Sequence, residues 1–122
     1  MKVILFQPRF APLVKDGSKR QTIRPTRKHP LKPGEIVSLR QWSSLPYRSP
    51  QTELRTAQIV SVESVSITLT GNLPVAINGR ILWADELQAF AVADGFASAG
   101  EMVTWFDDTH GLPFAGQIIR WK

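Results

Sequence analysis

The segment from Gly17 to Arg24 constrains the fold of this chain most, because a glycine and a proline restrict the backbone on its two sides. The residues before it have the i, i+3, i+4 apolar spacing of a short amphipathic helix (Phe10, Leu13 and Val14). Glycine adopts the left-handed conformation that ends a helix without a Cβ penalty, so we expect a helix over residues 9–16 that ends at Gly17. Pro25 then disfavours helical angles at Arg24. The sequence therefore predicts a helix, a tight turn and an extended strand.

Short strands are predicted in several other places. Apolar and β-branched stretches predict strands over residues 3–6, 36–40, 54–70 and 116–121. In the third of these the alternation breaks, which predicts a β-bulge near Glu63-Ser64. Asn78-Gly79 between two apolar runs predicts a β-hairpin. Two Pro-containing loops are expected over residues 25–33, which are basic, and 41–51, which are rich in serine.

Two further helices are predicted after the hairpin. Asp85 is expected to cap the first, which ends at Asp94-Gly95, and Ser98 with Glu101 forms a capping box that opens the second, through Phe106. Three tryptophans follow apolar spacing and are expected in the core (Trp83, Trp105 and Trp121). Five or six short strands with about three short helices predict an α+β, mainly β fold. We expect a small, partly open β-barrel that forms one domain over residues 1–122.

Composition excludes several classes of protein. The chain is 43% hydrophobic and 20% charged, as in an ordinary globular protein, and has no apolar run of about 20 residues. Its first residues lack the length and cleavage site of a signal peptide, so we expect a cytoplasmic protein that does not enter a membrane. There is no cysteine, and there are only two histidines, His29 and His110. We therefore expect no metal site and no cofactor, in a monomer or weak dimer.

Positive charge is concentrated in the first half of the sequence. Residues 1–60 hold twelve Lys and Arg against three acids, whereas residues 61–122 hold three against seven. A one-sided positive field attracts polyanions, of which nucleic acid is the usual one. The alternative is a solvated basic face without a partner.

Three blocks of sequence resemble the ASCH family, a branch of the PUA-like β-barrels. The first is the GxKxxTxR pattern on Gly17, Lys19, Thr22 and Arg24. The second is residues 93–102, where an acidic residue precedes Gly-Phe and a helix. The third runs from His110 to Phe114 and on to Trp121, and is similar to the closing strand of bacterial and phage-type members. The resemblance covers nearly the whole chain and is weakest over residues 41–54.

The resemblance implies a possible reaction. In family members credited with hydrolysing the amide of N4-acetylcytidine, the proposed groups correspond to Lys19 as base, Thr22 as nucleophile and Asp94 as acid or orienting group. A threonine hydroxyl needs such a base. Asp94 stands where those enzymes carry a glutamate, which is one methylene longer. In a regular strand Lys19 and Thr22 would point to opposite faces, so they can meet only if the turn extends through residue 18 or 19.

The same three residues also have simpler interpretations. Lys19 would then be a phosphate contact, Thr22 an ordinary strand residue and Asp94 a helix-end residue. Under these interpretations the protein is a non-catalytic RNA-binding regulatory module. A third possibility is a ribonuclease acting on single-stranded RNA, in which Lys19 and Arg24 stabilise the developing phosphorane.

Other residues are candidates for binding RNA or a modified nucleoside. The basic candidates are Arg20, Arg24, Arg27 and Lys28, and the aromatic candidates are Trp42, Tyr47 and Phe96. Arg24 would clamp a phosphate or carbonyl, or instead pair with a carboxylate such as that of Glu35. Exposed aromatic rings beside positive charge suit base stacking, and the alternative is that Trp42 and Tyr47 cover one end of the barrel. Phe96 could line a base pocket or pack on the barrel. His110 would have a catalytic role only if it lay close to Thr22.

Overall fold

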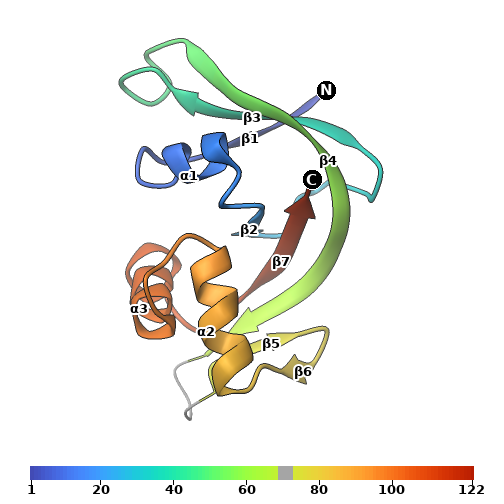
Figure 1. Cartoon of the computed structure of the whole chain (residues 1–122), viewed down its shortest axis with the longest axis vertical. Coiled ribbons are helices and arrows are strands. Elements are labelled where there is room, and N and C mark those ends of the chain that lie inside the picture. Colours follow the sequence, from blue (N-terminus) through green and yellow to red (C-terminus); the bar gives the residue numbers. More distant parts are fainter. Residues whose placement is uncertain (69–72) are drawn as a thin grey trace.

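The computed structural model describes residues 1–68 and 73–122 and shows an α+β fold that is mainly β, as predicted (Figure 1). The strands of the described residues are β1 (Lys2–Leu5), β2 (Gln21–Arg24), β3 (Ile36–Trp42), β4 (Gln51–Ile67), β5 (Val75–Ile77), β6 (Arg80–Ile81) and β7 (Phe114–Trp121). The helices are α1 (Ala11–Asp16), α2 (Ala84–Ala93) and α3 (Ala99–His110). Within the described residues, no helix is both long enough and apolar enough to cross a bilayer.

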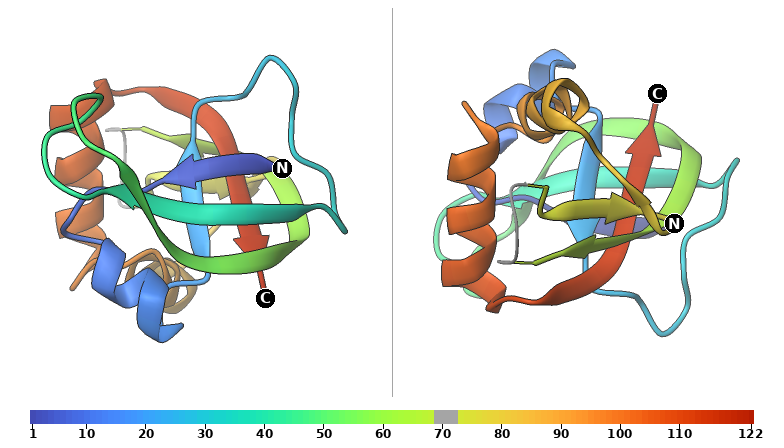
Figure 2. Two further views of the ribbon diagram at one scale, coloured as in Figure 1. Left: turned by 90° about the horizontal axis from the view of Figure 1, so that it is seen from above. Right: turned by 90° about the horizontal axis from the view of Figure 1, so that it is seen from below.

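The long strand β4 organises the sheet. Its first part pairs antiparallel with β3, which pairs in parallel with β1, and its second part pairs antiparallel with β7, which pairs with β2. The β5–β6 hairpin adds to the free side of the end of β4. Figure 2 shows how the sheet curls as β4 bends. The described residues form seven strands in one sheet, rather than five or six, and the sheet is not closed into a barrel.

The bulges of β4 do not lie where the broken alternation predicts one. Glu63 and Ser64 pair regularly with Ile118 and Gln117 of β7. The register shifts instead between Ile59 and Ser61, where β4 changes partner from β3 to β7, and again opposite Leu39 and Arg40 of β3. A bulge increases the bend and twist of its strand, so these positions let one strand serve both parts of the curved sheet.

Several local predictions are confirmed. Gly17 has φ 87° at the end of α1, and Asn78 and Gly79 have φ 51° and 80° in the β5–β6 turn. The Ser98 hydroxyl accepts from the amide of Glu101 at the start of α3, while the Glu101 carboxylate accepts from Ala97 rather than from Ser98. α3 extends to His110, beyond Phe106. The predicted strand over residues 54–70 ends at Ile67, and its last two positions lie outside the described residues.

Two predictions around α2 are wrong. Trp83 is 68% exposed rather than in the core, because the buried Leu82 points inward and Trp83 follows it at the extended N-cap position of α2. Asp85 lies inside the first turn and is not the cap. Trp121 is buried and Trp105 packs partly buried against the core, as expected.

Candidate functional site

Two chain turns bring Lys19 and Asp94 into contact in the interior. Lys19 lies in the turn after α1, whose geometry is fixed by Gly17 and by the hydrogen bond from the Lys19 amide to the Leu13 carbonyl at 3.0 Å. Asp94 is the C-terminal cap of α2, and Gly95 follows it with φ 101°. The Lys19 ammonium donates to the backbone carbonyl of Asp94, and Lys19 Nζ lies 3.4 Å from the side-chain Oδ1 of the same residue. Both residues are only 3% exposed.

Burial dominates the electrostatics of this pair. It lowers the pKa of Lys19, and the attraction of Asp94 opposes the shift only in part. It likewise raises the pKa of Asp94, against the attraction of Lys19. Gln21 supports the carboxylate, since its amide nitrogen lies 3.4 Å from Asp94 Oδ1. The pKa values of Lys19 and Asp94 therefore move toward each other.

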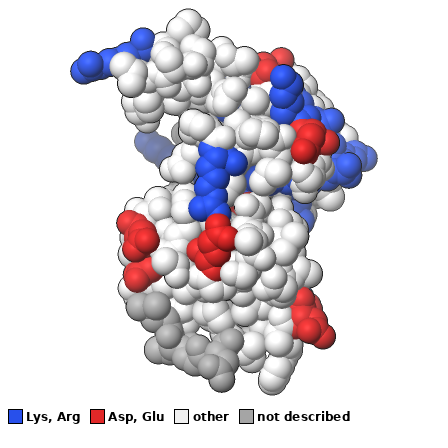
Figure 3. Space-filling view, turned by 60° about the vertical axis from the view of Figure 1, so that its left-hand side comes forward, with Lys and Arg blue, Asp and Glu red and all other residues white. Residues whose placement is uncertain are grey.

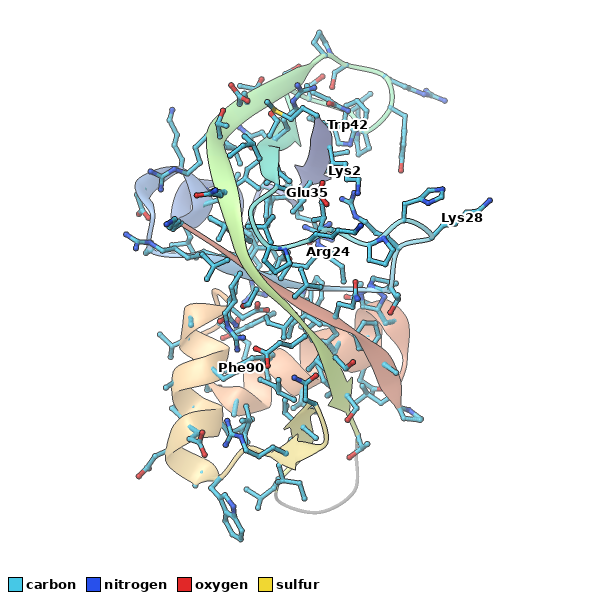
Figure 4. The ribbon with its side chains drawn as sticks, turned by 90° about the vertical axis from the view of Figure 1, so that its right-hand side faces the viewer. Lys2, Arg24, Lys28, Glu35, Trp42 and Phe90 are labelled. Carbon is cyan, nitrogen blue, oxygen red and sulfur yellow. The ribbon has the colours of Figure 1, made fainter. Side chains whose placement is uncertain are left out.

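Thr22 and Arg24 form the next part of the site. Strand β2 begins at Gln21, so Lys19 lies outside the regular strand, and Lys19 and Thr22 line the same pocket. Arg24 Nε donates to Thr22 Oγ1 at 2.9 Å, and its Nη2 donates to the Leu5 carbonyl at 2.6 Å. This leaves the Thr22 hydroxyl hydrogen free for another acceptor. The alternative ion pair of Arg24 with Glu35 does not form. Glu35 pairs with Lys2 instead, with Oε2 lying 3.5 Å from Lys2 Nζ (Figure 4).

These residues share one pocket of about 210 Å³. Its polar lining residues are Gln7, Lys19, Thr22, Arg24, Asp94, Thr109 and His110. Its aromatic walls are Phe6, Phe10, Trp105 and Phe106, from the end of β1, the start of α1 and α3. A dry cavity of about 150 Å³ already accepts benzene, so the pocket has room for a single substituted ring. Mostly apolar walls with a few converging polar groups are typical of small-ligand sites.

His110 lines this pocket together with Thr22. Its ring packs against Phe106 with centroids 5.6 Å apart and against Phe114 at 5.0 Å. His110 is exposed as a whole, but partial desolvation of its ring, and secondly the positive charge of Arg24, lower its pKa. The imidazole is therefore neutral at pH 7 and able to accept a proton. Sequence reasoning missed the aromatic walls, because rings at helical spacing are the ordinary pattern of a core.

The other predicted binding residues lie outside the pocket. Arg20 is exposed and donates to the Gly17 carbonyl, Arg27 donates to the Val3 carbonyl, and Lys28 extends into solvent (Figure 4). Phe96 is buried and packs on Phe10 with centroids 5.5 Å apart, as its packing interpretation predicted. It also borders a separate hollow of about 660 Å³ on the other side of Lys19. Trp42 and Tyr47 border a groove beside the pocket.

Charge is unevenly spread over the surface. On the face in Figure 3, Lys and Arg atoms gather mainly on the upper part of the molecule, while several acidic groups lie on the lower part. Figure 1 places the N-terminal strands in that upper part and α2 and α3 in the lower part. Within the described residues, no three His, Cys, Asp or Glu side chains are grouped to hold a metal ion.

Comparison with known proteins gives no relative. No protein-family model, no curated protein and no solved structure matches this chain.

Proposed function

We propose that the pocket binds the base of a modified cytidine, in RNA or as a nucleoside, and hydrolyses an acyl group from its exocyclic nitrogen. The observation that carries the proposal is the burial of Lys19, Thr22 and Asp94 together at the polar side of one aromatic-walled pocket. Surface residues used only for phosphate contacts would have no reason to be 3–4% exposed. The resemblance to the ASCH family supports the same reaction.

The walls and the polar side suit the two parts of such a ligand. A planar base packs favourably between aromatic rings such as those of Phe6 and Trp105. Arg24 and Lys19 supply N–H donors for a carbonyl oxygen, either on the base or on the acyl group. The donors on a preorganised, water-poor side also stabilise the oxyanion that forms when that carbonyl is attacked.

The reaction has two steps. The Thr22 hydroxyl gives its proton to the neutral amine of Lys19, and its oxygen bonds to the acyl carbon. The C–N4 bond then breaks, and the leaving amine takes up from Lys19 the proton that came from Thr22. In the second step, water gives a proton to Lys19 and its oxygen bonds to the acyl carbon. The bond from that carbon to Thr22 Oγ1 breaks, Oγ1 takes the proton from Lys19, and the carboxylic acid is released. Arg24, which donates to Thr22 Oγ1, lowers the energy of the oxygen as it loses its proton.

Asp94 orients Lys19 in this scheme. The resemblance raises the concern that an aspartate is one methylene too short. Here Asp94 reaches Lys19 twice, with its backbone carbonyl and with its carboxylate. Lys19 is therefore held in place despite the shorter side chain. The ribonuclease alternative fits this environment less well, because the Asp94 charge beside Lys19 repels a phosphate.

The test is incubation of the protein with N4-acetylcytidine and, separately, with single-stranded RNA, with both products analysed by mass. We expect free cytidine and acetate, and intact RNA. Thr22→Ala should reduce turnover by several orders of magnitude with little change in ligand affinity. Thr104→Ala on the exposed side of α3 is the matched control and should keep full turnover. Because burial lowers the pKa of Lys19, the rate should rise with pH and level off below the ordinary lysine value.

Other results identify the alternatives. Binding of N4-acetylcytidine without turnover by the unchanged protein would favour a non-catalytic module. Shortened RNA fragments would favour a ribonuclease. Turnover that survives Thr22→Ala would exclude Thr22 as nucleophile.

A further inference from the structure

A second groove adjoins the pocket and shares part of its wall. It has a volume of about 280 Å³ and lies between the end of β1 and the β3–β4 loop. Leu5, Phe6 and Gln7 line both hollows. On the far side the groove is formed by Trp42, Ser44, Pro46 and Tyr47, which we call the Trp42–Tyr47 platform. The two hollows therefore adjoin at these three residues.

Tyr47 occupies a backbone position that normally takes glycine. The amide of Arg48 donates to the Leu45 carbonyl at 3.2 Å, which closes a turn with Pro46 and Tyr47 at its centre. Tyr47 has φ 62°, and a positive φ at the third turn position is the geometry that favours glycine or asparagine. A bulky aromatic residue there costs conformational energy. Such strain at a residue that contributes little to the core indicates a functional constraint.

The Tyr47 ring is presented to solvent on a fixed loop. Tyr47 is 87% exposed, and its only ring partner among the described residues is Trp42, with centroids 5.1 Å apart. Hydrogen bonds across the loop hold its shape: Ser43 N to the Pro50 carbonyl at 2.9 Å, and Ser49 Oγ to the Leu45 carbonyl at 2.8 Å. The platform is thus preorganised, which reduces the entropy lost when a ligand binds.

The charge near the platform favours an anionic ligand. Arg48 lies in the same loop, and Arg27 is anchored to β1, whose end forms the wall shared by pocket and groove. Within the described part of the chain, neither Arg48, Arg27 nor Lys28 forms an ion pair with a carboxylate. Aromatic faces with free cations around them are the surface that single-stranded nucleic acid uses, through base stacking and phosphate contacts.

We propose that the Trp42–Tyr47 platform stacks the base next to the one held in the pocket, so that the ligand is a segment of single-stranded RNA rather than a free nucleoside. This inference rests on the proposed function for the pocket. It adds a second base-binding site and a substrate class. Because Leu5, Phe6 and Gln7 line both hollows, bases bound in the pocket and on the platform would both lie against these residues.

The test compares three ligands by isothermal titration: cytidine, the trinucleotide of three cytidines, and a trinucleotide with a central cytidine and abasic neighbours. The last two carry the same phosphates, so their difference reports stacking of the neighbouring bases alone. We expect the full trinucleotide to bind about five- to a hundredfold more tightly than the abasic one. Tyr47→Gly, which suits the positive φ, and Trp42→Ala should remove that difference and leave cytidine affinity unchanged.

The controls separate stacking from other effects. Tyr47→Phe keeps the ring and should keep the difference, and Trp83→Ala removes an exposed tryptophan at the start of α2, outside both hollows, and should have no effect. Equal affinity for the two trinucleotides, or a difference that survives Tyr47→Gly, would overturn the proposal and leave the platform to another kind of partner. The pocket and the platform can also fail separately. If the affinity difference between the two trinucleotides is lost in Tyr47→Gly, while Lys19→Met leaves the affinity for cytidine unchanged, the platform is supported and the function proposed for the pocket is contradicted.

Discussion

Lys19 and Asp94 illustrate the energetics of the site at the scale of single residues. Each is almost fully removed from water, and each would be costly as an isolated charge. Together they compensate one another, with Gln21 and a backbone carbonyl supplying the remaining hydrogen bonds. A pair of this kind is weak evidence for stability, since two apolar side chains would pack at lower cost. Its presence in the interior agrees with the chemistry proposed for the pocket.

A double-mutant cycle measures this dependence. Lys19→Met and Asp94→Asn should each destabilise the protein by up to about 3–5 kcal/mol, because each leaves one uncompensated buried group. The double variant should lose clearly less than the sum, since no buried charge remains. Urea denaturation at pH 7 gives the free energies of unfolding. Strictly additive losses would mean that the two side chains do not interact.

His110 gives a prediction on pH. Partial desolvation and the charge of Arg24 lower its pKa in the folded protein, so the unfolded chain takes up a proton first as the pH falls below about 6.5. The contribution of His110 to stability is therefore present above that pH and is lost as the pH falls through its folded pKa. The melting temperature should decrease less from pH 7.5 to pH 5 in His110→Gln than in the unchanged protein. An identical decrease in both would show that His110 titrates normally.

The ends of helices α1 and α2 position the site at the scale of elements. Gly17 ends α1 with a left-handed backbone, after which Lys19 points into the interior. Gly95 likewise has a positive φ and follows Asp94 at the end of α2. Gly95 has a second constraint: a Cβ there would lie 3.0 Å from Phe10 Cδ1 and 3.4 Å from Lys19 Cδ. The glycine therefore permits both the left-handed backbone and the close packing of the lysine stem.

Gly95→Ala should therefore destabilise the protein by more than about 1 kcal/mol, because the new methyl group strains the backbone and displaces Phe10 or Lys19. Gly100→Ala is the matched control. Gly100 lies in α3, and a Cβ added there would meet nothing nearer than Ser98 Oγ at 3.9 Å. An alanine at this position should leave stability unchanged or raise it by roughly 0.5–1 kcal/mol. Thermal unfolding of both variants distinguishes them, and equal melting temperatures would contradict the role given to Gly95.

For the whole molecule, local signals in the sequence predicted local structure well. Gly17, Asn78-Gly79 and Ser98 act through their own backbone or their nearest neighbours, so their patterns could be interpreted without the fold. Features that depend on distant partners were missed. The bulge follows from the change of β4 between two partner strands, and the exposure of Trp83 follows from the direction of Leu82. The aromatic walls and His110 join the site only in the folded chain, where Trp105 of α3 packs on Phe10 and Phe106 packs on Phe114 of β7.

The charge asymmetry of the whole chain leads to the last prediction. If the basic half contacts phosphates, affinity for a single-stranded RNA should fall by about 0.7 log units per log unit of salt for each contact, as counterions are released. Lys28→Gln should reduce that slope by about 0.7, the value of one phosphate contact. The Lys28 side chain extends into solvent and forms no ion pair within the described residues. Arg80→Gln is the control, since Arg80 lies in the acidic half and pairs with Glu86 at 2.9 Å. Affinity that does not change between low and moderate salt would exclude phosphate contacts and favour a neutral nucleoside in the pocket.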